Sequence, residues 1–269
     1  MVTIDINTAR RFVLGKQGLW PGRRWHGIEG TTHAMRAMEY LQLDPLQVIA
    51  RSHDMQLHSR VLAYTPGLWE DVTYQQRHFF DWGGWLTVQP MAELPHWRFV
   101  MRHERENGQR MRHMAAEFAD AIGEMRAILQ ERETVTNRDF KLGAKTRTPQ
   151  YRGRKDSAIA LYYLWRTGEV MTHHRENFER VYALMETVAP RHLITESDEV
   201  EAERFLITKD INFAGLSRLN RAQDVFCRPM PSSKVKQIRD RLLADGDLIE
   251  VQVESRSRCT TRSRATPTC

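Results

Sequence analysis

The same order of local signals occurs twice in this chain, 78 residues apart at Gly168 and Gly246, and this repeat constrains the fold more than any other feature. In each copy an amphipathic helix pattern leads to a glycine beside an acidic residue, and then to a strand pattern. Glycine often ends a helix in the left-handed conformation, so both copies predict a helix that turns directly into a strand. This is the order of the last helix and the β wing in a winged helix-turn-helix unit. The sequence therefore predicts tandem units of that kind, mainly α with small β wings.

The helices of the two copies are predicted to begin at Asp156 and Ser233, which are suited to cap a first turn. Their apolar faces are Ile159, Tyr162 and Tyr163 in the first copy and Val235, Ile238 and Leu242 in the second. The strands that follow are predicted to begin at Val170 and Leu248.

Helix patterns elsewhere fill out the expected units. Thr31 is a predicted N-cap, and residues 101–131 are predicted to form one long helix with an apolar, methionine-containing face. Residues 197–206 and 213–225 are predicted to be the first two helices of a later unit. Residues 79–99 are aromatic and contain several Gly and Pro, which favours a packed loop with a short strand.

We therefore expect three folded units and a tail. Residues 1–132 would form an N-terminal winged-helix unit with a long connecting helix, residues 133–190 a second unit, and residues 191–254 a third. Residues 255–269 are rich in Ser, Thr and Arg and lack apolar periodicity. They are expected to be disordered or aberrant, for example a frameshift product, with no contribution to folding; a genuine basic, phosphate-binding tail is the alternative.

The net charge of +6 is weak evidence of a nucleic-acid partner, because four arginines without an acid lie in residues 255–269 and only +2 remains for residues 1–254. The three cysteines have no metal-site spacing, which is typical of a reducing compartment. No apolar run approaches the roughly 18 residues of a membrane span. We expect a monomer in the cytoplasm, associated with the nucleoid and not with a membrane.

Local clustering of basic residues is more informative than the total. Residues 141–155 contain six basic residues and no acidic one. Such a run can contact phosphates, although many basic loops are simply solvated. Its position just before the helix of the first repeat favours contact, so Arg152, Arg154 and Lys155 are candidate nucleic-acid-binding residues.

Leu41-Gln42-Leu43-Asp44 alternates apolar and polar residues, so an extended backbone would place Gln42 and Asp44 on one face. Pro45 then predicts a turn. From spacing alone, the ordinary explanation is a turn that starts at Asp44 and an exposed Gln42 amide.

Residues 41–60, which contain this motif, resemble the AlkZ/YcaQ family of interstrand-crosslink DNA glycosylases, in particular its YcaQ (AlkX) branch. The resemblance continues at residues 175–184 and, with the wing repeat, covers most of residues 5–254. It implies tandem winged helices that form a concave, basic DNA channel with a Gln-apolar-Asp motif at its floor. It also implies that the partner is double-stranded DNA carrying alkylated purines, and that the N-glycosidic bond of N7-alkylated purines is hydrolysed. Some members of the family act on purines within crosslinks. The resemblance implies no cofactor and no metal.

The motif suits that chemistry. A purine alkylated at N7 is already cationic and leaves readily, so the enzyme must stabilise the oxocarbenium ion at the sugar and direct a water to it. Asp44 can supply the negative charge or act as general base, and the Gln42 amide can orient the water. We therefore predict that Gln42 and Asp44 are catalytic.

Basic side chains near these matched segments are candidate contacts to phosphate. They are Arg51, His53, Arg60 and Arg175. His53, which is neutral near pH 7, is better suited to a structural hydrogen bond than to catalysis. The alternative function is a winged-helix DNA-binding protein without catalysis, either a regulator or a truncated, inactive homologue, because family members typically continue into further β-rich structure after the segment matching residues 251–254.

Overall fold

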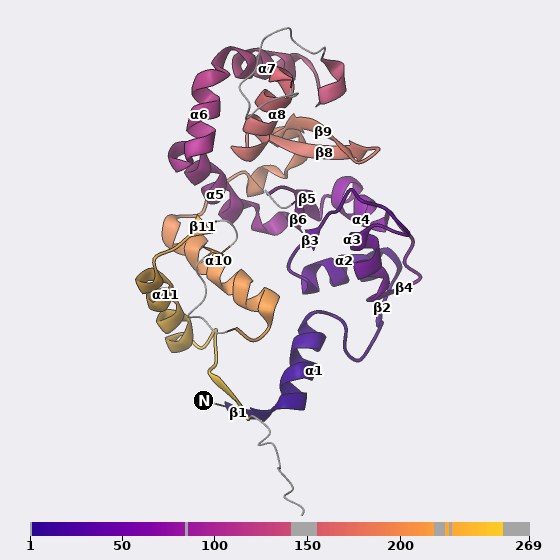
Figure 1. Cartoon of the computed structure of the whole chain (residues 1–269), viewed down its shortest axis with the longest axis vertical. Coiled ribbons are helices and arrows are strands. Elements are labelled where there is room, and N and C mark those ends of the chain that lie inside the picture. The colour runs from indigo at the N-terminus through magenta and orange to yellow at the C-terminus, as the bar shows by residue number, and fades with distance from the viewer. Residues whose placement is uncertain (1, 84–85, 141–154, 218–223, 226–227, 255–269) are drawn as a thin grey trace, which may run out of the picture.

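The computed structural model of the chain describes residues 2–83, 86–140, 155–217, 224–225 and 228–254 (Figure 1). This part is mainly helical with small sheets. Its α-helices are α1 (Ile6–Lys16), α2 (Gly27–Ala37), α3 (Ser52–His58), α4 (Leu68–Glu70), α5 (Leu94–Asn107), α6 (Gln109–Glu117), α7 (Ala119–Glu131), α8 (Asp156–Arg166), α9 (Met185–Val188), α10 (Glu199–Ala214) and α11 (Ser232–Ala244). Shorter helical turns are η1 (Asp71–Gln75), η2 (Met91–Glu93), η3 (Asn137–Asp139) and η5 (Arg191–Leu193).

The strands pair into sheets of two or three. They are β1 (Val2–Asp5), β2 (Trp25–His26), β3 (Leu41–Gln42), β4 (Val61–Leu62), β5 (Phe79–Asp81), β6 (Thr87–Pro90), β7 (Val135–Thr136), β8 (Val170–Glu176), β9 (Glu179–Leu184), β10 (Asp224–Val225), β11 (Arg228–Pro229) and β12 (Val251–Glu254). The sheets with three strands have the orders β3-β6-β5 and β7-β9-β8.

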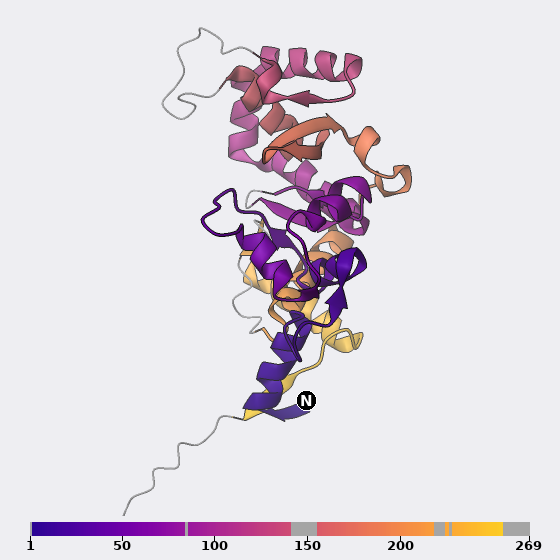
Figure 2. The ribbon, with the colours of Figure 1, turned by 90° about the vertical axis from the view of Figure 1, so that its right-hand side faces the viewer.

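The molecule is elongated, and it is narrower in the perpendicular view (Figure 1, Figure 2). Helices α7 and α8 lie at one end, and β1 pairs in parallel with β12 at the other. A smaller apolar core packs α2, β3 and α3 around Leu41, Leu57 and Trp69. A larger core runs from Phe80 to Leu242 and contains residues from all three predicted units. The boundaries between those units remain a prediction.

The first repeat has the predicted order of helix, glycine and strand. Helix α8 ends before Gly168, whose φ of +79° is left-handed, and β8 and β9 form an antiparallel hairpin. A Cβ at Gly168 would lie 2.6 Å from the Met101 sulfur, so close packing on α5 also requires glycine. The N-cap is Lys155, one residue before the predicted Asp156.

The second repeat has the same local order but a different strand partner. Helix α11 ends before Gly246, which has φ +80°, and β12 follows. In the described residues β12 pairs with β1, with Val251 opposite Val2, and not with a second strand of a wing. The N-cap is Pro231, so the prediction of Ser233 was wrong by two residues. The predicted tail, residues 255–269, lies outside the described residues.

The predicted long helix over residues 101–131 is wrong, because the chain forms α5, α6 and α7. The helix is interrupted at Gly108, which has an extended backbone (ψ 114°), and again at Phe118 (ψ 28°). The apolar face is nevertheless confirmed as core. Its buried members are Met111, Met114, Ile122, Met125 and Leu129.

Two further boundaries differ from the predictions. Thr31 is not an N-cap, since α2 begins at Gly27 and the Thr31 hydroxyl donates to the Gly27 carbonyl oxygen at 2.9 Å. Residues 213–225 do not form a separate helix in their described part, because α10 continues to Ala214 and Asp224–Val225 is strand β10. The short strand expected in residues 79–99 is confirmed by β5 and β6. No helix within the described ranges is long and apolar enough to cross a membrane.

Candidate active site

The predicted alternation at the end of β3 is confirmed. Leu41 and Leu43 are buried in the smaller core, whereas Gln42 is exposed and Asp44 is half-buried. Strand β3 pairs with β6, so Gln42 lies opposite Thr87, and the Leu43 amide donates to the Leu86 carbonyl oxygen at 2.7 Å. The sheet thus holds the backbone up to Leu43 and presents Gln42 and Asp44 at its accessible side.

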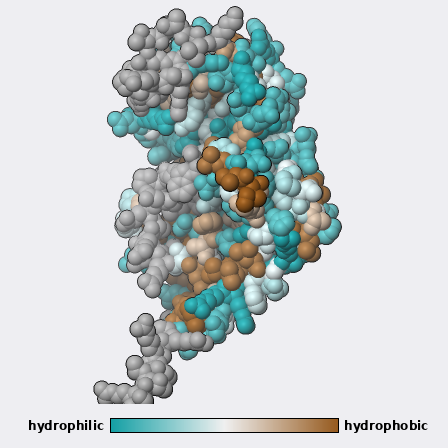
Figure 3. All heavy atoms as spheres, turned by 45° about the vertical axis from the view of Figure 1, so that its right-hand side comes forward, coloured by the Kyte–Doolittle hydropathy of each residue, from teal (hydrophilic) through white to brown (hydrophobic). Residues whose placement is uncertain are grey.

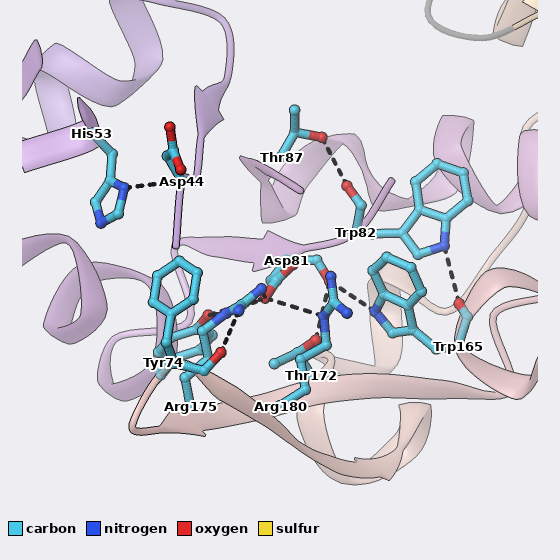
Figure 4. Close-up of polar contacts among 11 residues, drawn as sticks. Asp44, His53, Tyr74, Asp81, Trp82, Thr87, Trp165, Thr172, Arg175 and Arg180 are labelled. Carbon is cyan, nitrogen blue, oxygen red and sulfur yellow. Dashed lines mark hydrogen bonds and ion pairs between the residues drawn. The ribbon is translucent and has the colours of Figure 1, made fainter. Parts of the chain in front are cut away.

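Asp44 also begins the turn that Pro45 predicts. Its Oδ1 accepts a hydrogen bond from the Leu46 amide at 2.9 Å, which is the pattern of an Asx turn. Its own amide donates to Nδ1 of His53 at 3.2 Å (Figure 4). One hydrogen bond therefore holds the carboxylate and another holds the backbone of Asp44, while the residue remains partly accessible.

His53 is buried and serves as the acceptor that positions Asp44. Burial lowers the pKa of His53 to about 4, against the attraction of Asp54. Because Nδ1 accepts from the Asp44 amide, the ring proton of the neutral imidazole sits on Nε2, which makes no hydrogen bond within the described residues. The ring stacks on Phe178, with centroids 5.9 Å apart, and meets Trp69 edge-on at 5.1 Å. His53 has no exposed surface, and its contact with phosphate stays a prediction.

Phe178 comes from the tip of the β8–β9 hairpin and was missed by the sequence analysis. Asn177 and Phe178 have φ of +49° and +70°, the left-handed pair of a tight hairpin turn. Besides stacking on His53, the Phe178 ring lies under the Arg51 guanidinium, whose Cζ is 4.4 Å from the ring centroid. The sequence signal that could have identified Phe178 was an aromatic residue at the tip of a hairpin. The hairpin tip therefore packs against the segment that carries Asp44.

A buried ion pair holds the same hairpin to the β3-β6-β5 sheet. Asp81 has no exposed side-chain surface, and its Oδ2 lies 2.6 Å from Arg175 Nη2 and 3.7 Å from Arg180 Nε (Figure 4). The Tyr74 hydroxyl donates to the same oxygen at 3.2 Å, and burial raises the pKa of Tyr74 well above its usual value. Asp81 was also missed, although one acid within an aromatic run indicates a buried, paired charge.

This ion pair gives Arg175, a predicted DNA contact, a partner within the chain. Its side chain is 3% exposed and bound to Asp81, and Nη1 donates to the Phe178 carbonyl oxygen at 2.8 Å. Burial lowers the pKa of Arg175, but the charges and hydrogen bonds of Asp81 and Tyr74 together outweigh burial and raise that pKa. The guanidinium therefore holds the β8–β9 hairpin to β5, and a contact with DNA phosphate stays a prediction.

Two other predicted DNA contacts have structural roles. Arg60 is buried, and its guanidinium donates to the carbonyl oxygens of Gln17 and Gln56, at 2.6 and 2.8 Å. Lys155 Nζ donates to the carbonyl oxygens of Asn137 and Phe140. The charged groups of Arg60 and Lys155 are thus engaged by the chain, and their contact with DNA phosphate stays a prediction.

The remaining candidates stay open. Arg51 is half-buried beside Phe178, with its Nε buried and without a hydrogen bond in the described part of the chain. Arg152 and Arg154 lie outside the described residues, as does the rest of the basic segment 141–154. Of the nine predicted site residues, the structure brings together Asp44, His53, Arg51 and Arg175, the last three around Phe178, with Gln42 on the same short segment as Asp44.

Comparisons with known proteins agree with this architecture. Residues 35–267 match a family model described as DNA glycosylase AlkZ-like, and the match includes both Gln42 and Asp44. The solved DNA glycosylase AlkZ of Streptomyces sahachiroi has a similar structure, with a TM-score of 0.65 over 94% of this chain and 68% of that chain. The two sequences are 11% identical over this alignment, so the structural similarity shows a shared fold.

Proposed function

Because the chain belongs to the AlkZ-like DNA glycosylase family, we propose that it hydrolyses the N-glycosidic bond of N7-alkylated purines in double-stranded DNA. Gln42 and Asp44 are the residues to which we assign the reaction. The observation that carries this assignment is the placement of Asp44, a half-buried carboxylate at a strand end whose backbone is bound to a buried, neutral histidine.

In this mechanism the N7-alkylated base leaves with its bonding electrons, and the positive charge of the base is neutralised as the bond breaks. The sugar becomes an oxocarbenium ion, and a water then attacks C1′ and loses a proton. Asp44 stabilises the sugar cation through its charge and accepts that proton, while the Gln42 amide accepts from and donates to the water.

The surroundings of Asp44 support this role. The half-buried position limits screening by water, so a fixed negative charge acts more strongly on a developing cation than it would in solvent. His53, with its pKa near 4, stays neutral near pH 7 and does not cancel the charge of Asp44. The hydrogen bond from the Leu46 amide fixes one carboxylate oxygen and leaves the second to act on the substrate.

Tandem winged helices that line a basic DNA channel remain part of the proposal. The unit formed by α8, β8 and β9 supports it, since the hairpin follows the helix as a wing does. Acceptance of interstrand crosslinks is a further proposal, based on the family resemblance of residues 41–60 and 175–184.

The rival function is DNA binding without catalysis, which the Asx turn at Asp44 favours because that turn alone would explain the residue. The test uses a duplex with one N7-methylguanine, and a second duplex crosslinked between N7 atoms, each incubated with the purified full chain. Release of free N7-methylguanine, leaving an abasic site, supports the glycosylase. Binding of either duplex without release at any enzyme excess would establish the rival.

A further inference from the structure

The chain directly after Asp44 carries the most exposed large apolar side chains of the described residues. Leu46, Val48 and Ile49 are 74%, 95% and 92% exposed. They lie in residues 45–50, Pro-Leu-Gln-Val-Ile-Ala, which contain no charged residue and are called the apolar loop below. A loop of this part of the chain projects from the body (Figure 2), and a strongly hydrophobic protrusion surrounded largely by hydrophilic atoms stands at mid-height on the face in Figure 3.

Both ends of the apolar loop are anchored, one to the buried His53 and the other to the partly buried Phe178. On one side the Asp44 amide is bound to His53, and the Leu46 amide is bound to the Asp44 carboxylate. On the other side the Arg51 guanidinium lies 4.4 Å from the centroid of Phe178. The exposed side chains therefore lie on a loop whose two ends are fixed. A fixed loop can keep its position when its side chains insert into a binding partner.

The position of the loop limits what its partner can be. Val48 is four residues from Asp44, so its Cα lies within roughly 14 Å of the carboxylate-bearing residue, or about four base-pair steps. If Asp44 acts at C1′, where sugar joins base, the loop must lie at the base pairs next to the lesion. Within that distance the apolar surface of duplex DNA is the face of the base pairs, while the backbone is charged and would not favour an uncharged aliphatic loop.

Resting on the proposed function, we propose that the apolar loop is a wedge that enters the duplex from the minor groove beside the damaged nucleotide. Val48 and Ile49 insert between base pairs and unstack them, and Leu46 covers the opened step. Aliphatic side chains unstack base steps in this way in many minor-groove-binding proteins. The opened step exposes C1′ to Asp44 and to the attacking water.

The test places the fluorescent base 2-aminopurine next to one N7-methylguanine in a duplex and measures its emission as the protein binds. The full chain carrying Asp44→Asn is used so that the base is retained. We expect a several-fold rise in fluorescence from unstacking, and loss of that rise when Val48→Ser and Ile49→Ser are added. Val200→Ser is the matched control, because Val200 is 61% exposed but lies on α10. The control should keep the full rise.

The Val48→Ser/Ile49→Ser variant with Asp44 intact should excise N7-methylguanine about 10- to 100-fold more slowly, as expected for a misplaced reacting centre. Its melting temperature should not fall, because both side chains are exposed. An unchanged fluorescence rise in the loop variants would overturn the wedge. So would a wild-type dimer that these substitutions convert to monomers, since a second copy would then cover the loop. Excision by the wild type with no fluorescence rise in Asp44→Asn would overturn the wedge alone, whereas a rise in Asp44→Asn with no excision by the wild type would overturn the proposed function alone.

Discussion

At the residue scale, His53 shows how burial decides a role that sequence leaves open. Its position eight residues after Pro45, next to Arg51, suits a phosphate contact as well as a structural one. The structure removes it from solvent, so the imidazole is neutral and its Nδ1 can accept from the Asp44 amide. A charged histidine could not accept that bond, and the site geometry therefore depends on the low pKa.

This low pKa predicts a pH-dependent stability. The unfolded chain binds a proton on His53 below about 6.5, whereas the folded chain does so only below about 4. Unfolding therefore takes up a proton in that window, and the free energy of unfolding falls as the pH falls from 6.5 to 4. At pH 5 the loss from this residue should be about 2 kcal/mol. His53→Asn keeps an acceptor for the Asp44 amide but does not titrate. In urea unfolding, its free energy of unfolding should therefore fall less between pH 7 and pH 5 than that of the wild type. Equal losses in both proteins would refute the assignment.

At the scale of elements, the β8–β9 hairpin is joined to the N-terminal part of the chain by its tip and by its strands. Phe178 packs on His53, and Arg175 pairs with Asp81 on β5. In the proposed winged-helix unit this hairpin would be the wing, an element that often contacts DNA, but its tip packs against the segment that carries Asp44. The hairpin is therefore expected to act on catalysis through the position of that segment.

The buried pair predicts a large effect of Arg175→Met. It would leave the Asp81 carboxylate buried with only the more distant Arg180 as counter-charge, which should lower the free energy of unfolding by about 3 kcal/mol. The matched control is Arg138→Met, since Arg138 and Glu179 pair at 2.7 Å with about half of each side chain exposed. That change should lower the free energy of unfolding much less than Arg175→Met does, because water screens an exposed pair. Similar effects of the two substitutions in urea unfolding would show that the Arg175 pair is not a buried anchor.

The sequence could predict those features of these elements that depend on interactions between residues close together in the chain. Alternation at Leu41–Asp44 and the turn at Pro45 depend on neighbouring residues, and both are confirmed. The helix and glycine at Gly168 are local as well. The contact of Phe178 with His53 and the pairing of β12 with β1 join residues far apart in the chain, and no short pattern encodes them. The breaks at Gly108 and Phe118 were missed because the apolar face continues through both.

At the scale of the whole molecule, we expect DNA binding to depend little on duplex sequence, because the expected contacts are to phosphates. The chain has a net charge of +6, and its affinity for DNA should fall as the salt concentration rises. The fall should be about tenfold between 50 and 200 mM salt for every two phosphates contacted. The slope should be the same for different duplex sequences and unchanged in Arg175→Met, whose guanidinium is buried in the folded wild type. Binding that does not respond to salt, or that strongly prefers one sequence, would instead favour a regulator.

The most direct test of the account is the single-turnover rate of N7-methylguanine release by Asp44→Asn. This change keeps the shape of the side chain and removes its charge, so the rate should fall by about 10²- to 10³-fold while DNA affinity stays nearly constant. Gln42→Ala should cost less, because an amide offers only a dipole. Asp71→Asn, at an exposed carboxylate of η1 outside the site, should retain the wild-type rate. Release by Asp44→Asn at the wild-type rate would contradict the assignment of Asp44 as the group that stabilises the sugar cation.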